Sequence, residues 1–265
     1  MQGYTAYSEN GAWFCGPNLG QCKAGERGNL SDTIQSEKAT TASLGFKTEF
    51  VPVTGVSVIA ELPFHRLRYR KDFGDGQVLL LQTDGVGDLR LAARAGLTAG
   101  SWGFAAGYAL ELPTGEFAVS AALAPVGSGT RNHDLFVEFG RSLWPAPLFA
   151  EAGVLVRLRE AHTDEDAVMT DWGDELHARL HGGWNFSGPW TLQSSIHAFR
   201  SGARSTNVPG EPRDQFRSLL ELVPGALLEA GAVRIEGWLN IPLAGRNTPS
   251  DPRVGISVTW FANGP

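Results

Sequence analysis

The sequence of 265 residues contains no long hydrophobic run. No segment approaches the roughly 18 consecutive apolar residues that a membrane-spanning helix requires, which excludes a helical membrane protein. A basic balance of charge is absent too, because the net charge is −6 at pH 7. This charge gives no indication of nucleic-acid binding, which depends on basic surfaces.

Motifs for catalysis and metal binding are also missing. There is no G-x-S-x-G nucleophile elbow, and no serine, histidine and carboxylate come together by spacing, so we predict that the protein is not an enzyme. His177 and His181 would suit a metal on a helix, but on an extended strand they lie roughly 13 Å apart. The acidic run at 164–175, DEDAVMTDWGDE, lacks the glycine and ligand pattern of a calcium loop. We therefore predict no metal site and no cofactor.

Cysteine occurs only twice, as Cys15 and Cys22 in WFCGPNLGQCKAG. With glycine and proline between them, the two thiols are suited to closing a small disulfide loop in an oxidising compartment, and this is the preferred interpretation. The alternative is two reduced thiols. A zinc site would need further ligands at suitable spacing, and none stands nearby in the sequence.

Alternation of polar and apolar residues is what the chain has in abundance. In residues 85–97, GVGDLRLAARAGL, Asp88, Arg90 and Arg94 fall on one side of an extended chain and the leucines fall on the other. This period of two is that of a β-strand. It recurs clearly in 41–50, 55–62, 101–112, 149–160, 175–186, 232–243 and 253–262, and more weakly in 134–143, 190–200 and 213–223.

The links between these segments predict how the strands are connected. Short links such as 98–101 alternate with long ones such as 71–85 and 113–133, which is the layout of hairpins in a transmembrane β-barrel. Eleven strands follow from residue 41, and residues 2–12 are expected to supply another, since single-chain bacterial barrels usually have an even number. We predict an all-β fold, a transmembrane antiparallel up-and-down β-barrel of about 12 strands.

The chain divides into two expected regions. Residues 1–38 are predicted to form an N-terminal strand and an outer loop that carries the cysteine pair; the alternatives are a plug or a periplasmic tail. Residues 39–265 are predicted to form the barrel in the cell outer membrane. With the short turns on the periplasmic side, the strand at 253–262 runs inward, so the C-terminus is expected in the periplasm.

Alternation by itself also fits a soluble sandwich, in which apolar residues face a core. Three features favour a membrane barrel whose leucines face lipid: the polar face carries both signs of charge, it is rich in glycine and alanine, and aromatic residues lie near strand ends. The alternative for the charged residues is a closed interior in which they pair with one another. The residues expected to line the lumen are Asp88, Arg90, Arg94, Glu111, Glu151, Arg157, Arg159, Glu175, His177, Arg179, His181, Arg234 and Glu236.

The link at 113–134, PTGEFAVSAALAPVGSGTRNHD, is long and apolar in its middle. Because such side chains are poorly suited to water, Phe117, Val119 and Leu123 are expected to fold into the barrel mouth as a constriction or binding lid. The alternatives are packing against other outer loops, or longer strands.

Four segments, in order, resemble a known family: GVGDLRLAARAGL, PVGSGTRNHDLFVEFGRSLWP, DWGDELHARLHGGW and PLAGRN. Over residues 50–262 the chain is similar to the outer-membrane transporter family named for the MetA pathway of phenol degradation. The resemblance implies a twelve-stranded or similar outer-membrane barrel and the passage of small, often aromatic, compounds. It brings no catalytic residues to transfer, and residues 1–38 lie outside it.

The sequence therefore predicts a channel or transporter for small solutes, including aromatic or hydrophobic ones. The expected partners are membrane lipid and a small-molecule permeant, and no nucleic acid. The alternative is a non-conducting structural barrel that scaffolds a surface lipoprotein, a cytochrome or another envelope complex, which would add an envelope protein as a partner.

Overall fold

The structure, a computed structural model, is built of antiparallel strands. It describes residues 2–9, 12–14, 27–29, 36–72, 78–115, 127–163, 169–171, 173–203, 205–206, 216–246, 248–249 and 252–261. Within that part of the chain, no helix has the length and apolar character needed to cross a bilayer.

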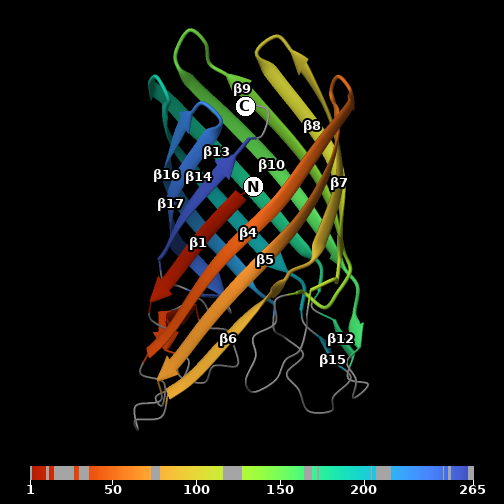
Figure 1. Ribbon diagram of the computed structural model, residues 1–265, viewed down its shortest axis with the longest axis vertical. Coiled ribbons are helices and arrows are strands. Elements are labelled where there is room, and N and C mark those ends of the chain that lie inside the picture. Colours follow the sequence, from red (N-terminus) through yellow and green to blue (C-terminus); the bar gives the residue numbers. More distant parts are fainter. Residues whose placement is uncertain are drawn as a thin grey trace.

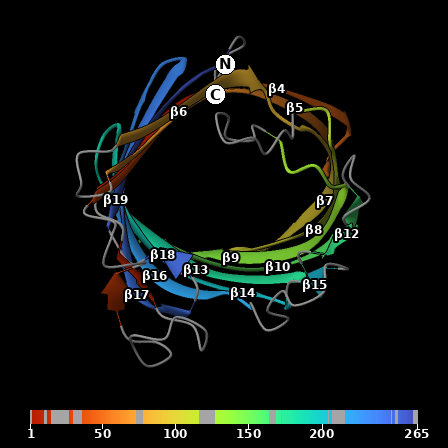
Figure 2. The ribbon, with the colours of Figure 1, turned by 90° about the horizontal axis from the view of Figure 1, so that it is seen from below.

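Thirteen strands form one sheet. In sheet order they are β4 (Ser36–Val53), β1 (Gln2–Glu9), β19 (Arg253–Trp260), β17 (Val233–Arg246), β16 (Ser218–Ala230), β14 (Trp190–Ser201), β13 (Glu175–Ser187), β10 (Leu148–Arg159), β9 (Asn132–Ser142), β8 (Trp102–Leu112), β7 (Leu89–Ala99), β5 (Val56–Asp72) and β6 (Val78–Val86). β4 also pairs with β5, which closes the sheet into a barrel (Figure 1, Figure 2). Closure matters in hydrocarbon, where an unpaired backbone group costs several kcal/mol.

The thirteen strands occupy twelve positions around the barrel, because β6 and β7 follow one another along the same side of β5. Residues 56–61 of β5 pair with β7, and residues 64–72 pair with β6. The predicted fold class is therefore confirmed: the protein is an all-β antiparallel barrel with twelve strand positions.

The positions of β1 and β6 test two of the predicted features, the additional strand and the long link at 71–85. β1 pairs with β19 on one side and with β4 on the other, at the position expected for the additional strand. The long link expected at 71–85 is wrong, since β5 continues to Asp72 and β6 begins at Val78. The run VLLLQTDGV has three successive leucines, so its side chains do not show the period of two from which a strand is predicted. The strand forms nevertheless, because its pairing with β5 uses backbone groups.

Short turns lie at one end of the barrel and longer connections at the other (Figure 1). Gly100 and Gly231, in two of the short turns, have φ values of 61° and 56°, a region that glycine adopts without steric cost. Two small sheets belong to the long connections and consist of β11 (His162–Thr163), β12 (Met169–Asp171) and β15 (Ser205–Thr206), and of β18 (Thr248–Pro249), β2 (Ala12–Phe14) and β3 (Arg27–Asn29).

Burial in this barrel is the reverse of that in a water-soluble protein. Among the described residues, the buried hydrophobic side chains are Ala92 and Ala109 alone, whereas thirteen buried residues are polar or charged. Large apolar side chains are exposed instead, for example Leu97 at 63% and Phe139 at 50%. A soluble sandwich would bury such residues between two sheets, so the outward apolar face is that of a sheet surrounded by lipid.

Candidate functional site

Polar residues of successive strands lie side by side on the inner face of the barrel. The register places Arg90, Glu111, Asn132 and Arg159 in one row across β7, β8, β9 and β10. Paired residues share one face of a sheet, and alternate residues along a strand return to it. The side chains of Asn132 and Asp134 are fully buried. Only the concave side of a single-layer barrel offers such burial.

By the same register, the structure places most of the charged residues selected from the sequence on this polar face. They are Arg90, Arg94, Glu111, Glu151, Arg157, Arg159, Glu175, His177, Arg179, His181, Arg234 and Glu236. Asp88 is different, because it stands between β6 and β7 and is bound to backbone.

The most buried ion pair is centred on Asp134, whose side chain is 1% exposed. Arg157 donates two parallel hydrogen bonds to it, from Nε to Oδ1 at 2.7 Å and from Nη2 to Oδ2 at 3.0 Å. Arg90 Nη2 lies 3.5 Å from the same Oδ2, and Arg157 Nη2 lies 3.6 Å from Glu111 Oε2. The planar guanidinium matches a carboxylate in this geometry, which offsets part of the cost of removing both charges from water.

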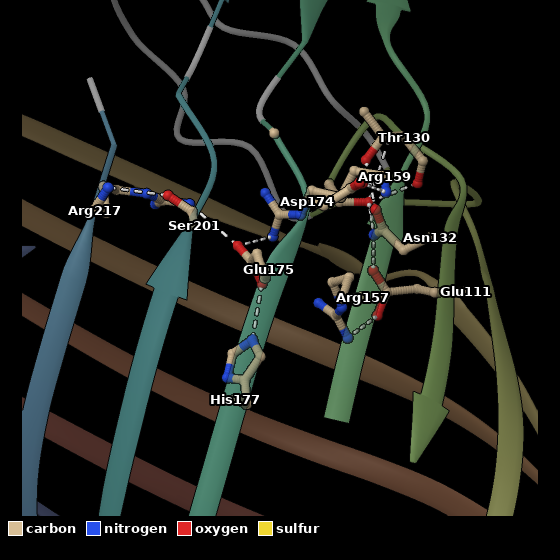
Figure 3. A network of polar contacts seen from close by, with 12 residues as sticks. Glu111, Thr130, Asn132, Arg157, Arg159, Asp174, Glu175, His177, Ser201 and Arg217 are labelled. Atoms are coloured by element: carbon tan, nitrogen blue, oxygen red, sulfur yellow. Dashed lines mark hydrogen bonds and ion pairs between the residues drawn. The ribbon is translucent and has the colours of Figure 1, made fainter. Parts of the chain in front are cut away.

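A second buried carboxylate, Glu175 at the start of β13, has three basic neighbours (Figure 3). Arg159 Nη2 lies 2.8 Å and Arg217 Nη2 3.2 Å from its Oε1, while His177 Nε2 lies 3.0 Å from its Oε2. Together, Asp134 and Glu175 with their arginine, histidine and Glu111 partners are called the long-link cluster below. All of them stand at, or within two residues of, strand ends at the side of the long connections.

A third buried carboxylate is Glu221 on β16. Arg253 donates from Nη2 to its Oε2 at 2.7 Å, Asn240 donates from Nδ2 to its Oε1 at 3.3 Å, and His197 Nδ1 lies 3.5 Å from Oε1. The alternation did not single out Asp134 or Glu221, because both stand in segments where the period of two is weak. Known strand bounds would have placed both on the polar face.

Toward the short turns, a cavity of about 890 Å³ borders the inner face and is called the short-turn chamber below. Arg94 Nη2 lies 3.3 Å from Glu138 Oε2, and Arg179 Nη2 lies 3.6 Å from Glu138 Oε1. The side chains of these three residues are 38–47% exposed. They therefore face open space, in contrast to the buried pairs of the long-link cluster.

The ion pairs that connect different parts of the wall join strands, or the ends of strands, that are neighbours or next neighbours in the barrel. Arg94 reaches Glu138 across β8, and Arg179 reaches Glu138 across β10. The crossed strands present Ala105 and Gly153 beside Glu138, which leaves room for the arginine chains to lie along the wall. No ion pair in the described part of the chain spans the interior from one side to the other.

Aromatic rings also lie on the inner face, a feature that the charged pattern alone did not reveal. Three of them cover glycines of neighbouring strands, and a Cβ at any of these glycines would collide with the ring: Phe136 over Gly107, Phe149 over Gly183, and Trp238 over Gly255. The centre of the Phe149 ring also lies 5.3 Å from that of His181. Glycine in a strand commonly marks such a close approach.

Asp88 binds the two ends of the connection between β8 and β9. Its Oδ1 accepts a hydrogen bond from the Gly115 N–H at 3.0 Å, and its Oδ2 accepts one from the Ser128 N–H at 2.6 Å. A Cβ at Gly115 would lie 2.9 Å from Gly127 Cα, so the absence of a side chain lets the two ends approach closely. We call this arrangement the Asp88 clamp.

The other predicted residues fall into two groups. Arg234 pairs with Glu229, and Glu236 accepts a hydrogen bond from Gln193 Nε2 at 2.6 Å. Five residues lie outside the part of the chain that the structure describes, so the constriction loop and the disulfide stay predictions: Phe117, Val119, Leu123, Cys15 and Cys22. The described residues contain no group of three His, Cys, Asp or Glu side chains placed to hold a metal.

Solved structures share this architecture. The COG4313 outer membrane channel from Pseudomonas putida F1 matches with a TM-score of 0.79 and 16% identity, over 98% of this chain and 94% of that chain. The NanC porin (TM-score 0.52, 7% identity, 98% and 99%) and the beta domain of the Bordetella autotransporter Brka (TM-score 0.52, 13% identity, 98% and 98%) are more distant. The fold is that of an outer-membrane β-barrel. No protein-family model matches the sequence, and no curated protein matches it.

The outward face of this outer-membrane β-barrel carries aromatic residues at the short-turn end. The Trp102 ring lies 4.9 Å from the guanidinium carbon of Arg141, and Trp144 is 82% exposed. Trp260 at the end of β19 pairs with Val233 beside the turn between β16 and β17. Amphipathic rings at strand ends suit the boundary between lipid and water.

A charged pair marks the opposite limit of the apolar face on β5 and β6. Arg66 donates to Asp84 through Nε and Nη2, both at 2.9 Å. The next outward pair toward the short turns is Phe64 and Val86, which are 42% and 45% exposed. The outward face thus changes from apolar to ionic within two residues on each strand.

Proposed function

We propose that the protein is an outer-membrane channel for small solutes and that the polar inner face lines a hydrated lumen. The main support for this proposal is the direction of the ion pairs. They run along the wall, past Ala105 and Gly153, and do not cross the interior. A salt-bridged core would instead need pairs between opposite walls. Twelve strand positions also make a wider barrel than the eight-stranded kind that side chains fill.

The proposed orientation has the short turns in the periplasm and the long connections outside, as is usual for bacterial outer-membrane barrels. β19 ends beside a short turn, so the C-terminus is proposed to be periplasmic. The rings of Trp102, Trp144 and Trp260 then lie at the periplasmic boundary of the membrane, and the apolar face contacts lipid.

Solutes with aromatic or hydrophobic parts are the proposed permeants. Phe149 borders the short-turn chamber, and Phe136 and Trp238 lie on the same inner face, so flat apolar rings interrupt the polar wall. The name of the Pseudomonas putida protein, an outer membrane channel, supports the same role here. The relation to the transporter family of phenol degradation is also a proposal, and it rests on the four sequence segments that resemble that family.

Planar-bilayer recording of the purified protein tests the channel proposal. We expect discrete conductance steps on insertion, and smaller steps for Gly103→Trp, since a Cβ on Gly103 meets open space beside the chamber. Ala106→Trp is the matched control, because it adds the same ring on the outward face of the same strand, and its steps should equal those of the wild type. A wild-type protein that inserts without conducting, and that copurifies with an envelope protein, would support a structural barrel instead.

A further inference from the structure

The charges that border the short-turn chamber are not balanced. On the inner face, three carboxylates against two guanidinium groups leave one negative charge in excess: Glu49, Glu138 and Glu151 against Arg94 and Arg179. Arg141 borders the same cavity from the outward face, where its guanidinium carbon lies 4.9 Å from the centre of the Trp102 ring. It therefore adds no charge to the inner wall.

Both chamber arginines bind one carboxylate. Arg94 and Arg179 approach different oxygens of Glu138, Oε2 at 3.3 Å and Oε1 at 3.6 Å. Glu49 and Glu151 are exposed, and neither forms an ion pair with a residue that the structure describes. A solute in the chamber thus meets two carboxylates that have no contact with an arginine in the described part of the chain.

The long-link cluster does not present its charges in this way. Arg157 and Arg159 are 22% and 16% exposed and are turned toward Asp134 and Glu175, which are 1% and 5% exposed. Each arginine and each carboxylate of this cluster has a group of opposite charge within 3.6 Å, measured between nitrogen and oxygen. The exposed charges of the chamber are therefore those that a permeant encounters most directly.

We propose that the short-turn chamber selects permeants by charge and favours small organic cations, such as protonated amines, over anions. The inference rests on the proposed channel function and names the residues that set its preference, Glu49 and Glu151. Rings of carboxylate side chains favour cations in other channels. In unscreened water, a unit charge about 8 Å away changes the energy of an ion by about RT, and salt at about 0.1 M reduces this to about 0.4 RT. Because the effect has opposite sign for a cation and an anion, each chamber charge should alter the permeability ratio about two-fold.

Reversal potentials in a potassium chloride gradient test the proposal. The wild type should prefer potassium to chloride. The double variant Glu49→Gln and Glu151→Gln turns the excess of one negative charge into an excess of one positive charge, so its preference should change sign. Arg94→Gln should increase the preference for potassium about two-fold. Vesicle uptake of benzylammonium and benzoate should show the same order for organic ions.

Glu160→Gln is the matched control, because it removes one carboxylate that is paired with Arg131 and lies outside the chamber. Its reversal potential should equal that of the wild type. Conductance without ion preference, or a double variant that still prefers potassium, would overturn the selectivity inference and leave the channel proposal standing. A protein that inserts without any conductance would end both proposals.

Discussion

Asp134 and Glu138 stand on the same strand, β9, and on the same face, but their surroundings differ. The side chain of Asp134 is 1% exposed and accepts a forked pair of hydrogen bonds from Arg157. The side chain of Glu138 is 38% exposed and has two arginines at longer distances. At the residue scale, therefore, the free energy of an ion pair on this face depends on how much water each partner has lost.

Asp134→Asn should lower the free energy of unfolding by about 3–5 kcal/mol, because the largely buried Arg157 would lose the carboxylate that it binds through two hydrogen bonds and keep only the longer contact to Glu111. Glu138→Gln is the matched comparison and should change it by about 0–1 kcal/mol, as expected for an exposed pair. Urea unfolding in lipid vesicles, followed by tryptophan fluorescence, measures both. Equal losses for the two variants would contradict the role that we assign to burial.

At the scale of elements, the break between β6 and β7 also positions a residue that binds a neighbouring connection. It places Asp88 where its carboxylate can bind the N–H groups of Gly115 and Ser128. Thr114 adds to the same junction, since its Oγ1 donates to the Gly87 carbonyl at 3.1 Å and accepts from the Leu89 N–H at 2.9 Å. The clamp thus ties the connection between β8 and β9 to the wall beside it.

Asp88→Ala should release this connection, because each hydrogen bond to a charged group contributes about 1.5–3 kcal/mol. We expect faster limited proteolysis between Gly115 and Gly127 in the folded variant than in the wild type. Asp84→Ala is the control on the adjoining strand, since Asp84 binds Arg66 on the outward face and not the connection. Its rate of cleavage in this segment should match that of the wild type.

The same elements show what can be predicted from the sequence. β7, β8 and β17 alternate cleanly, so their presence and the face of each side chain followed from the period of two. β6 was missed because its leucines are consecutive. Ion partners could not be assigned, because the register depends on turns and on bulges such as that between Leu220 and Glu221. A shift by one residue would move every side chain to the other face.

At the scale of the whole molecule, the wall has one sheet and no second layer, so each side chain is either inside the ring or outside it (Figure 2). Outward positions are apolar over a continuous band, as Leu91, Leu97 and Phe104 illustrate at 39%, 63% and 46% exposure. Inward positions are mostly polar or small, with the rings of Phe136, Phe149 and Trp238 among them. Insertion into a bilayer therefore depends on which of the two sides receives a charge.

Leu91→Arg should impair insertion, because an arginine on the lipid face costs about 2–4 kcal/mol near the middle of the bilayer. Ala105→Arg introduces the same side chain on the inner face of the adjacent strand, beside Glu138, and should insert normally. The heat-modifiable shift in gel mobility after folding into vesicles reports the inserted fraction. Normal insertion of the Leu91 variant would contradict the assignment of the lipid-facing side.

The pairing of β1 with β19 has a consequence for biogenesis. Gln2 lies opposite Thr259, so the seam that completes the cylinder joins the first and last strands (Figure 2). Contacts between residues so far apart in sequence form slowly, and the seam needs the final strand. Without β19 this ladder cannot form, and a truncation that removed β1 should leave two unpaired sheet edges that can recruit a foreign strand.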